Sequence, residues 1–430
     1  MNNNSVNAAT QNPIQKASKY RYLIALILMF TIGVSYADRV SISVLIANPD
    51  FMSAMGITGQ AVQKGMLMSV FLIAYGLANV FLGSLGDVFG PRKVMCMAII
   101  LWAVSMILGG LANVFAFMLL ARVLLGVGEG MQYPLMGTYV KNWFPQQERG
   151  RANACWTIGM TLAPAIALPF FGWLIITFGW RYNFFFCALL SMVPLYLILT
   201  HTTDVPSQNQ HVNKEELEYI QAGMEEDTIQ ADVAAKEPYL TRLKKFSHNY
   251  RFWMMVVWYM GIQIILWGLV TWLPSYLKMG RGFSWTEMGF LASMPFVLGI
   301  FVKAATGWAI DVVHKSGIFC LLATVGAALG LYFSATIENN WISAVLIICS
   351  QGFMYMGSPA SFTLLQKLVP AGSMATATGL MIGLSMFAGA VSPMLIGYFI
   401  NFTGSYSGGI FFLGIAAVIS TVAMLPLAKQ

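Results

Sequence analysis

Twelve apolar segments, each long enough to cross a lipid bilayer, limit what this chain can fold into. A hydrocarbon core about 30 Å thick takes about 20 residues of helix, and backbone that faces lipid must satisfy its hydrogen bonds within the helix. The segments are 22–48, 65–84, 94–112, 116–140, 152–177, 182–200, 252–273, 288–310, 317–336, 341–364, 374–400 and 407–427. We therefore predict an all-α membrane protein with twelve transmembrane helices in two six-helix bundles. The expected parts are a tail at 1–21, an N-terminal bundle at 22–200, a connecting loop at 201–250 and a C-terminal bundle at 251–430.

Lysine and arginine residues are distributed unevenly between the two sides of the predicted membrane. If the N-terminus is cytoplasmic, seventeen of them fall at cytoplasmic ends of the segments, and four, Lys64, Arg181, Lys278 and Arg281, fall at outer ends. Basic residues concentrate on the cytoplasmic side of membrane proteins. We expect a multi-pass protein of a bacterial inner membrane, with both termini and the connecting loop in the cytoplasm. The net charge of +7 then reflects topology, and no nucleic acid partner is expected.

Residue types that usually carry enzyme or metal chemistry lack the required arrangement in this sequence. The five cysteines fall in apolar segments at no metal-ligand spacing, and the four histidines lie in polar connections. We predict no enzyme activity, no metal and no cofactor. Any proton transfer inside the membrane must then use carboxylates.

The two halves of the chain repeat each other at a nearly constant offset. Pro134 and Pro145 recur 225 residues later as Pro359 and Pro370, and each pair is eleven residues apart. Proline inside a helix removes a hydrogen bond and is costly unless the fold uses the break. The matched offsets therefore predict two bundles in the same orientation, related by an axis along the membrane normal.

The polar connection between the second and third segments carries a specific motif. Residues 83–93 read GSLGDVFGPRK, and a degenerate copy at 307–315 follows the eighth segment. This stretch resembles the signature loop of the major facilitator superfamily. The resemblance implies a latch that stabilises one transport conformation and does not touch the substrate. Its candidate residues are Gly83, Asp87, Gly90, Arg92 and Asp311.

Finer motifs resemble one branch of that superfamily, the anion:cation symporters, along nearly the whole chain. The matching stretches are 36–39 in the first segment, 122–134 in the fourth, 143–150 after it, 179–181 before the sixth and 272–277 at the end of the seventh. This branch includes bacterial carriers for galactonate, glucarate and hexuronates. The resemblance implies a proton-coupled symporter that imports a small organic anion, most simply a sugar acid. We also expect a monomer, and sodium stays open as a coupling ion.

Five charged residues fall inside the predicted spans, where a charge costs about 3 kcal/mol or more. They are the acids Asp38 and Glu129 and the bases Arg39, Arg122 and Lys303. Their formal charges sum to +1, which suits a single anion. Arg39 and Arg122 are the candidate substrate contacts, because a guanidinium stays charged and offers two donors to a carboxylate. The resemblance assigns proton coupling to Asp38 and Glu129. The alternative is a purely structural Glu129–Arg122 pair.

Uncharged residues of the spans supply further candidates for substrate contacts. They are Tyr36 and Tyr75 in the first half, Gln351, Tyr355, Ser358, Ser361 and Phe362 on the tenth segment, and Gln263 and Ser385. Both tyrosines match positions of the family, and the tenth segment holds its substrate-contact stretch. The amides and hydroxyls can bond sugar hydroxyls. Each of these residues alone fits an ordinary polar contact between helices at least as well.

Two residues depart from the family pattern. Met160 stands where sugar-acid carriers often have a glutamine on the fifth helix, and Lys303 on the eighth segment matches no position of the pattern. Lys303 lies about 12 Å from the helix end at a rise of about 1.5 Å per residue, so we expect its ammonium to reach cytoplasmic water. In the alternative, Lys303 is a second cationic contact and the substrate is a dianion or carries a different acidic group.

Two other functions stay open. An organophosphate/phosphate antiporter would need a basic residue in the middle of the seventh segment, which has none after Arg251. A transporter-like sensor would bind a sugar acid and signal through a partner that docks on the acidic loop 201–250. Within that loop, residues 213–220 are expected to form a short helix that is capped by Asn213 and exposed to solvent.

Overall fold

The computed structural model describes residues 17–82, 85–222, 239–313, 315–370 and 373–429. Within these ranges every regular element is helical, and twelve helical spans are long and apolar enough to cross a membrane. The first six are α1 (Tyr20–Leu45), α3 (Ala61–Leu82), α5 (Pro91–Leu111), α6 (Phe115–Gly130) with α7 (Gln132–Trp143), α8 (Gln146–Phe178) and α9 (Trp180–His201). The other six are α13 (Tyr250–Ser275), α14 (Trp285–Val313), α15 (Ser316–Thr336), α16 (Asn340–Leu368), α17 (Met374–Thr403) and α18 (Tyr406–Met424). The predicted all-α membrane fold is confirmed.

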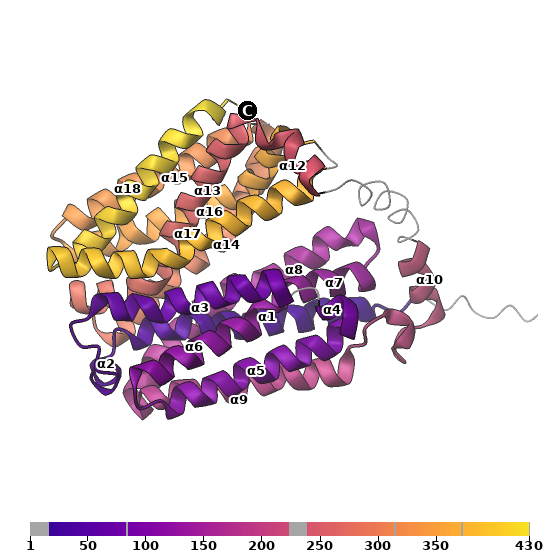
Figure 1. Cartoon of the computed structure of the whole chain (residues 1–430), viewed down its shortest axis with the longest axis horizontal. Coiled ribbons are helices and arrows are strands. Elements are labelled where there is room, and N and C mark those ends of the chain that lie inside the picture. Colours follow the sequence, from indigo (N-terminus) through magenta and orange to yellow (C-terminus); the bar gives the residue numbers. More distant parts are fainter. Residues whose placement is uncertain (1–16, 83–84, 223–238, 314, 371–372, 430) are drawn as a thin grey trace, which may run out of the picture.

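The long helices form two bundles, the first from α1 to α9 and the second from α13 to α18 (Figure 1). Four helices make the main contact between the bundles, because α3 packs on α17 and α8 packs on α14. Short helices lie at the ends of the spans or in the connecting loop. They are α2 (Pro49–Ala54), α4 (Leu85–Phe89), α10 (Lys214–Ala222) and α12 (Tyr239–Ser247).

At the end of the molecule that carries α2, the two bundles meet backbone to backbone. A Cβ atom on Gly65 would overlap the carbonyl of Pro393, and one on Gly397 would overlap the carbonyl of Ala61. The amide of Ala61 also donates a hydrogen bond to Asn401 Oδ1 at 3.2 Å. Because only glycine permits so close an approach, this end is sealed in the conformation described.

Helices α4, α7, α10 and α12 lie at the opposite end (Figure 1). A cavity between the bundles extends toward that end. Its wall extends along α3 as far as Val80 and along α17 as far as Gly379. The molecule is therefore open at one end and sealed at the other.

The fourth span is broken at Met131, which separates α6 from α7. Pro134 has no N–H to donate to the carbonyl of Gly130, so the helix cannot continue regularly there. The break places Tyr133, on the first turn of α7, at the cavity wall. The matching Pro359 lies inside α16, which stays continuous. The repeat thus predicts where a proline stands but not whether its helix breaks.

The predicted latch lies only partly within the described residues. Gly83 and the side chains of Asp87 and Asp311 lie outside them, so the latch function stays a prediction. Gly90 has a φ of +86°, which favours glycine. The amide of Arg92 donates to Asp204 Oδ1 at 2.8 Å, and its guanidinium donates to the carbonyl of Leu199. The described part of this loop thus joins the start of α5 to the end of α9.

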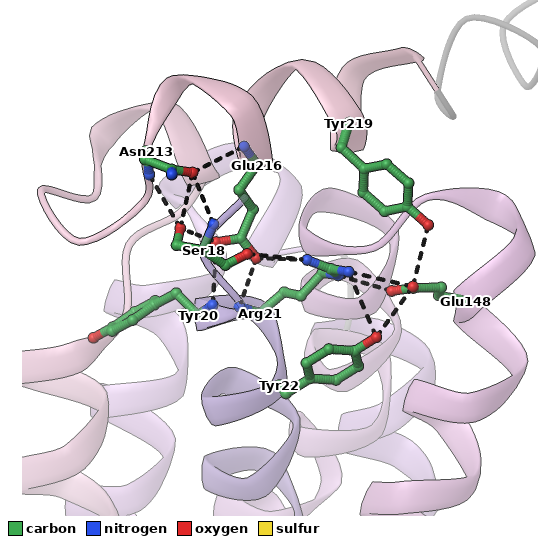
Figure 2. Close-up of polar contacts among 8 residues, drawn as sticks. All are labelled: Ser18, Tyr20, Arg21, Tyr22, Glu148, Asn213, Glu216 and Tyr219. Atoms are coloured by element: carbon green, nitrogen blue, oxygen red, sulfur yellow. Dashed lines mark hydrogen bonds and ion pairs between the residues drawn. The ribbon is translucent and has the colours of Figure 1, made fainter. Parts of the chain in front are cut away.

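Helix α10 lies at the surface as predicted, but one of its faces is docked on the N-terminal bundle (Figure 2). Asn213 caps it as predicted, since its Oδ1 accepts from the Glu216 amide at 3.0 Å. The Glu216 side chain, however, is 0% exposed and lies 2.8 Å from Arg21 Nη1. Arg21 Nε also lies 2.7 Å from Glu148 Oε2 at the start of α8. The buried guanidinium needs both acids, and this requirement holds α10 against α1 and α8.

Candidate substrate and proton site

A cavity of about 800 Å³ lies between the two bundles. Helices α1, α3, α7 and α8 line one side of it, and helices α13, α14, α16 and α17 line the other. Among the described residues that line it, Arg39 and Lys303 are cationic and none carries a carboxylate. An anion can therefore occupy this cavity without meeting a like charge on the wall.

Arg39 on α1 is the cation that the N-terminal bundle contributes to the cavity. Its guanidinium lies over the rings of Tyr36 at 4.3 Å and Tyr75 at 4.6 Å, and Trp267 of the other bundle lies at 5.6 Å. These rings cover the faces of the guanidinium and leave its edge for acceptors in the plane. Nη2 and Nε donate to Glu129 Oε2 at 2.9 Å and 3.2 Å. Nη1 has no hydrogen-bond partner in the part of the chain described.

Asp38, Glu129 and Arg122 are buried inside the N-terminal bundle and do not line the cavity. The ion pair that forms is Glu129–Arg39 and not the alternative Glu129–Arg122. Arg122 Nε donates to the carbonyl of Leu67 at 3.2 Å. Among the described residues, neither oxygen of Asp38, nor Glu129 Oε1, nor the terminal nitrogens of Arg122 have a hydrogen-bond partner. Buried polar atoms usually have hydrogen-bond partners, so this group is unusual. The three side chains form a layer of buried charges that is farther from the cavity than Arg39.

Close packing of α6 on α3 positions this layer. A Cβ atom on Gly126 would overlap the carbonyl of Phe71, and one on Gly130 would overlap the carbonyl of Tyr75. Because Arg122, Gly126 and Glu129 share one helix face, both charged side chains point toward the helices that α6 approaches. The second span, α3, therefore fills the space beside these glycines.

The predicted uncharged contacts divide into two groups. Tyr36, Tyr75, Tyr355, Ser358, Phe362 and Gln263 line the cavity. Gln351, Ser361 and Ser385 are buried and do not line it. The hydroxyl of Ser361 is satisfied locally, donating to the carbonyl of Ser358 at 3.0 Å. On α16, the sequence therefore predicted three residues that line the cavity and two, Gln351 and Ser361, that do not.

Lys303 does not extend to water at the end of α14, so that expectation is wrong. Its Nζ lies 3.5 Å from Thr161 Oγ1 and 4.7 Å from the centre of the Tyr355 ring. Both neighbours line the cavity, as Lys303 itself does. The side chain of Lys303 therefore lies in the space between the bundles.

Several aromatic residues of the wall had no distinguishing signal in the sequence. They are Tyr133, Trp156, Tyr259 and Trp267. The hydroxyl of Tyr133 lies 2.9 Å from that of Tyr36 and 3.0 Å from Met160 Sδ. Only the spacing of four residues from Glu129 to Tyr133, across a break, could have suggested a common face.

Comparison with known proteins identifies the family and the fold. The sequence matches the family model described as Major Facilitator Superfamily over residues 28–393. The Escherichia coli K12 protein named "Probable galactarate/D-glucarate transporter GudP" is 28% identical over 96% of this chain and 94% of its own length. The Cupriavidus necator protein named "Probable sulfoacetate transporter SauU" is 30% identical over 94% of this chain and 93% of its own.

A solved structure of a bacterial homologue of the human lysosomal transporter Spinster, inward-facing and unoccupied, has the same fold. It superposes with a TM-score of 0.76 and 17% sequence identity, over 96% of this chain and 99% of that one. The chain belongs to the major facilitator superfamily, and it is a multi-pass membrane transporter, not an enzyme.

Proposed function

We propose that this protein imports an organic anion together with protons, and that the anion is most simply a sugar acid. The observation that carries the proposal is the pair formed by Arg39, a cation of the cavity wall, and Glu129, a buried acid. Relatives named as transporters of galactarate or D-glucarate and of sulfoacetate, all organic anions, support the substrate class.

Arg39 is the proposed primary contact for the anion. Its ring-covered faces leave in-plane donors, the geometry that suits a carboxylate. The hydroxyls of Tyr36, Tyr75 and Tyr133 lie around it and can bond hydroxyl groups of a sugar acid. Arg122 does not line the cavity, and in this proposal it acts on the substrate only through its charge.

Glu129 and the substrate compete for the same guanidinium. Ionised Glu129 holds Nε and Nη2 of Arg39, while a proton on Glu129 weakens this bond and makes the donors available to an anion. Asp38 lies in the same buried layer, where an unpaired carboxylate is costly unless it binds a proton. Proton binding therefore favours anion binding, and such mutual reinforcement is the thermodynamic basis of symport.

We place both termini in the cytoplasm of a bacterial inner membrane. The cavity then opens to the cytoplasm, and the end sealed by Gly65 and Gly397 faces outward. Rocking of the two bundles about the site would expose it to the other side. The driving force is electrochemical, since one proton that crosses 100 mV releases about 2.3 kcal/mol.

Transport by the purified protein in liposomes tests this proposal. Labelled galactonate, glucuronate and glucarate are offered first in counterflow and then in uptake with an inward proton gradient. We expect counterflow of at least one of them and concentrative uptake that the proton gradient drives. Uptake driven only by a sodium gradient would overturn proton coupling, and exchange with inorganic phosphate would indicate an antiporter. Binding without any flux would indicate a sensor.

A further inference from the structure

Lys303, on α14 of the C-terminal bundle, lines the same cavity as Arg39, on α1 of the N-terminal bundle. Its ammonium contacts Tyr355 of its own bundle and Thr161 of the other bundle, with Nζ 3.5 Å from Thr161 Oγ1. The side chain therefore crosses the space between the two halves of the molecule.

No carboxylate of the described residues forms an ion pair with Lys303. Its contacts are a hydroxyl group and an aromatic ring, which are both uncharged. A positive charge at membrane depth is costly unless it pairs with a negative charge or faces water in a cavity, and an anion that enters the cavity displaces that water. Since the cavity wall offers no acid among the residues described, the geometry favours neutralisation by a ligand.

Polar groups of the N-terminal wall lie close to each of the two cations. Arg39 lies over the ring of Tyr36, whose hydroxyl is 2.9 Å from that of Tyr133. Tyr133 donates to Met160 Sδ at 3.0 Å, and Met160 directly precedes Thr161, which the lysine contacts. Arg39, Lys303 and these hydroxyl groups line one cavity, so a single ligand can contact both cations.

We propose that the substrate is a dianion, and that Lys303 binds its second anionic group while Arg39 binds the first. This inference rests on the proposed function and adds the substrate class. The hydroxyl groups that line the same cavity suit a polyhydroxylated diacid. The three cations and two acids of the spans sum to +1, so a dianion leaves one excess negative charge, which a proton on Asp38 or Glu129 removes.

Galactarate and galactonate form a matched pair for the test, because they share a hydroxylated six-carbon chain and differ in the second carboxylate. Counterflow of each labelled anion is measured in proteoliposomes, with sulfoacetate as a shorter competing dianion. In the wild type we expect half-saturation at about tenfold lower galactarate than galactonate. Lys303→Gln should raise the half-saturating concentration of galactarate about tenfold or more and change that of galactonate by less than about twofold. Lys303→Arg should keep the preference.

Lys141→Gln serves as the matched control, because Lys141 is exposed on α7 and does not line the cavity. This variant should change the half-saturating concentration of neither anion. If Lys303→Gln does not fold, thermal unfolding of the wild type in detergent decides, since galactarate or sulfoacetate should stabilise it more than galactonate does.

The dianion inference is wrong if the wild type handles galactarate and galactonate alike, or if Lys303→Gln weakens both equally. In either case anion transport still stands. If the wild type carries none of galactarate, galactonate, glucuronate and glucarate, the proposed function itself fails.

Discussion

Glu129 accepts both of its hydrogen bonds from Arg39 through one oxygen, Oε2, which lies 3.2 Å from Nε and 2.9 Å from Nη2. In the usual bidentate pair each carboxylate oxygen accepts one bond. Here Glu129 Oε1 and Arg39 Nη1 have no partner among the residues described. The pair is thus incomplete on both sides. A proton on Oε1 would neutralise Glu129 and weaken the two bonds that Oε2 accepts, which suits a reversible coupling site.

Substitution of Glu129 by glutamine tests this role. Glu129→Gln keeps the shape of the side chain but removes its charge and its ability to bind and release a proton. We expect counterflow to persist, because exchange of labelled for unlabelled anion needs no net proton movement. Concentrative uptake driven by a proton gradient should fall to simple equilibration. The measurement is the ratio of internal to external substrate in proteoliposomes.

Glu338→Gln is the control for this variant, because Glu338 is exposed in the connection between α15 and α16. It should accumulate substrate as the wild type does. A Glu129→Gln protein that still concentrates the anion would remove Glu129 from the coupling mechanism.

Asp38→Asn is expected to lose proton-driven accumulation as well. Asp38 is 0% exposed, and neither of its oxygens has a hydrogen-bond partner in the described part of the chain. The neutral amide removes the need to bind a proton before the bundles move. Proton uptake that accompanies substrate addition, followed with a pH-sensitive dye in lightly buffered liposomes, should decrease. Full accumulation with unchanged proton uptake would show that Asp38 is only structural.

Arg39→Lys is expected to weaken substrate binding. The variant keeps the positive charge but loses the planar fork and the stacking on Tyr36 and Tyr75. A hydrogen bond to a charged group contributes about 1.5–3 kcal/mol, so the half-saturating substrate concentration should rise about 10- to 150-fold. Arg122→Lys should have a much smaller effect, because Arg122 does not line the cavity. Equal losses in the two variants would contradict this assignment.

The fold could be predicted because apolar length alone identifies a membrane span, and the repeated prolines identify two related bundles. Details that depend on distant partners could not. The acidic residues of α10 look solvated in the sequence, since Arg21, which buries Glu216, stands 195 positions earlier. The start of α8 was placed at residue 152, yet the helix begins at Gln146. Its first turns are polar, so apolarity does not reveal them.

The site could be predicted as a set of buried charges but not as a surface. Asp38 and Arg39 are neighbours in sequence, and side chains on adjacent helical positions point in different directions. Arg39 lines the cavity and Asp38 does not. The direction of Lys303 depends on Thr161 and Tyr355, from two other helices. The aromatic wall stayed hidden because a chain with 29 Phe and 12 Trp gives no way to select the few that line a cavity.

Gly65→Ala is expected to shift the protein away from the conformation described here. The added Cβ atom would overlap the carbonyl of Pro393, so the sealed end could not close fully. Ala61→Cys, at a position that is 4% exposed, can report this change through labelling by a membrane-impermeant maleimide. Labelling should increase and transport should slow in Gly65→Ala. In Gly414→Ala, where a Cβ atom meets nothing within 4 Å, both should stay unchanged. Unaltered labelling in Gly65→Ala would contradict the sealing role.

Arg21→Gln is expected to destabilise the protein, because it leaves Glu148 and Glu216 without the cation between them (Figure 2). Removal of one partner from a buried ion pair costs about 3–5 kcal/mol, and we expect the lower end because the cluster lies near the surface of the molecule.

The exposed pair of Lys214 and Glu218, at 3.6 Å, provides the control. Lys214→Gln should cost about 0.5 kcal/mol or less. Thermal unfolding in detergent gives the comparison, and adding Glu216→Gln to Arg21→Gln should recover part of the loss, since it removes one unpaired acid. If Arg21→Gln proves as mild as Lys214→Gln, the cluster does not hold α10 in place.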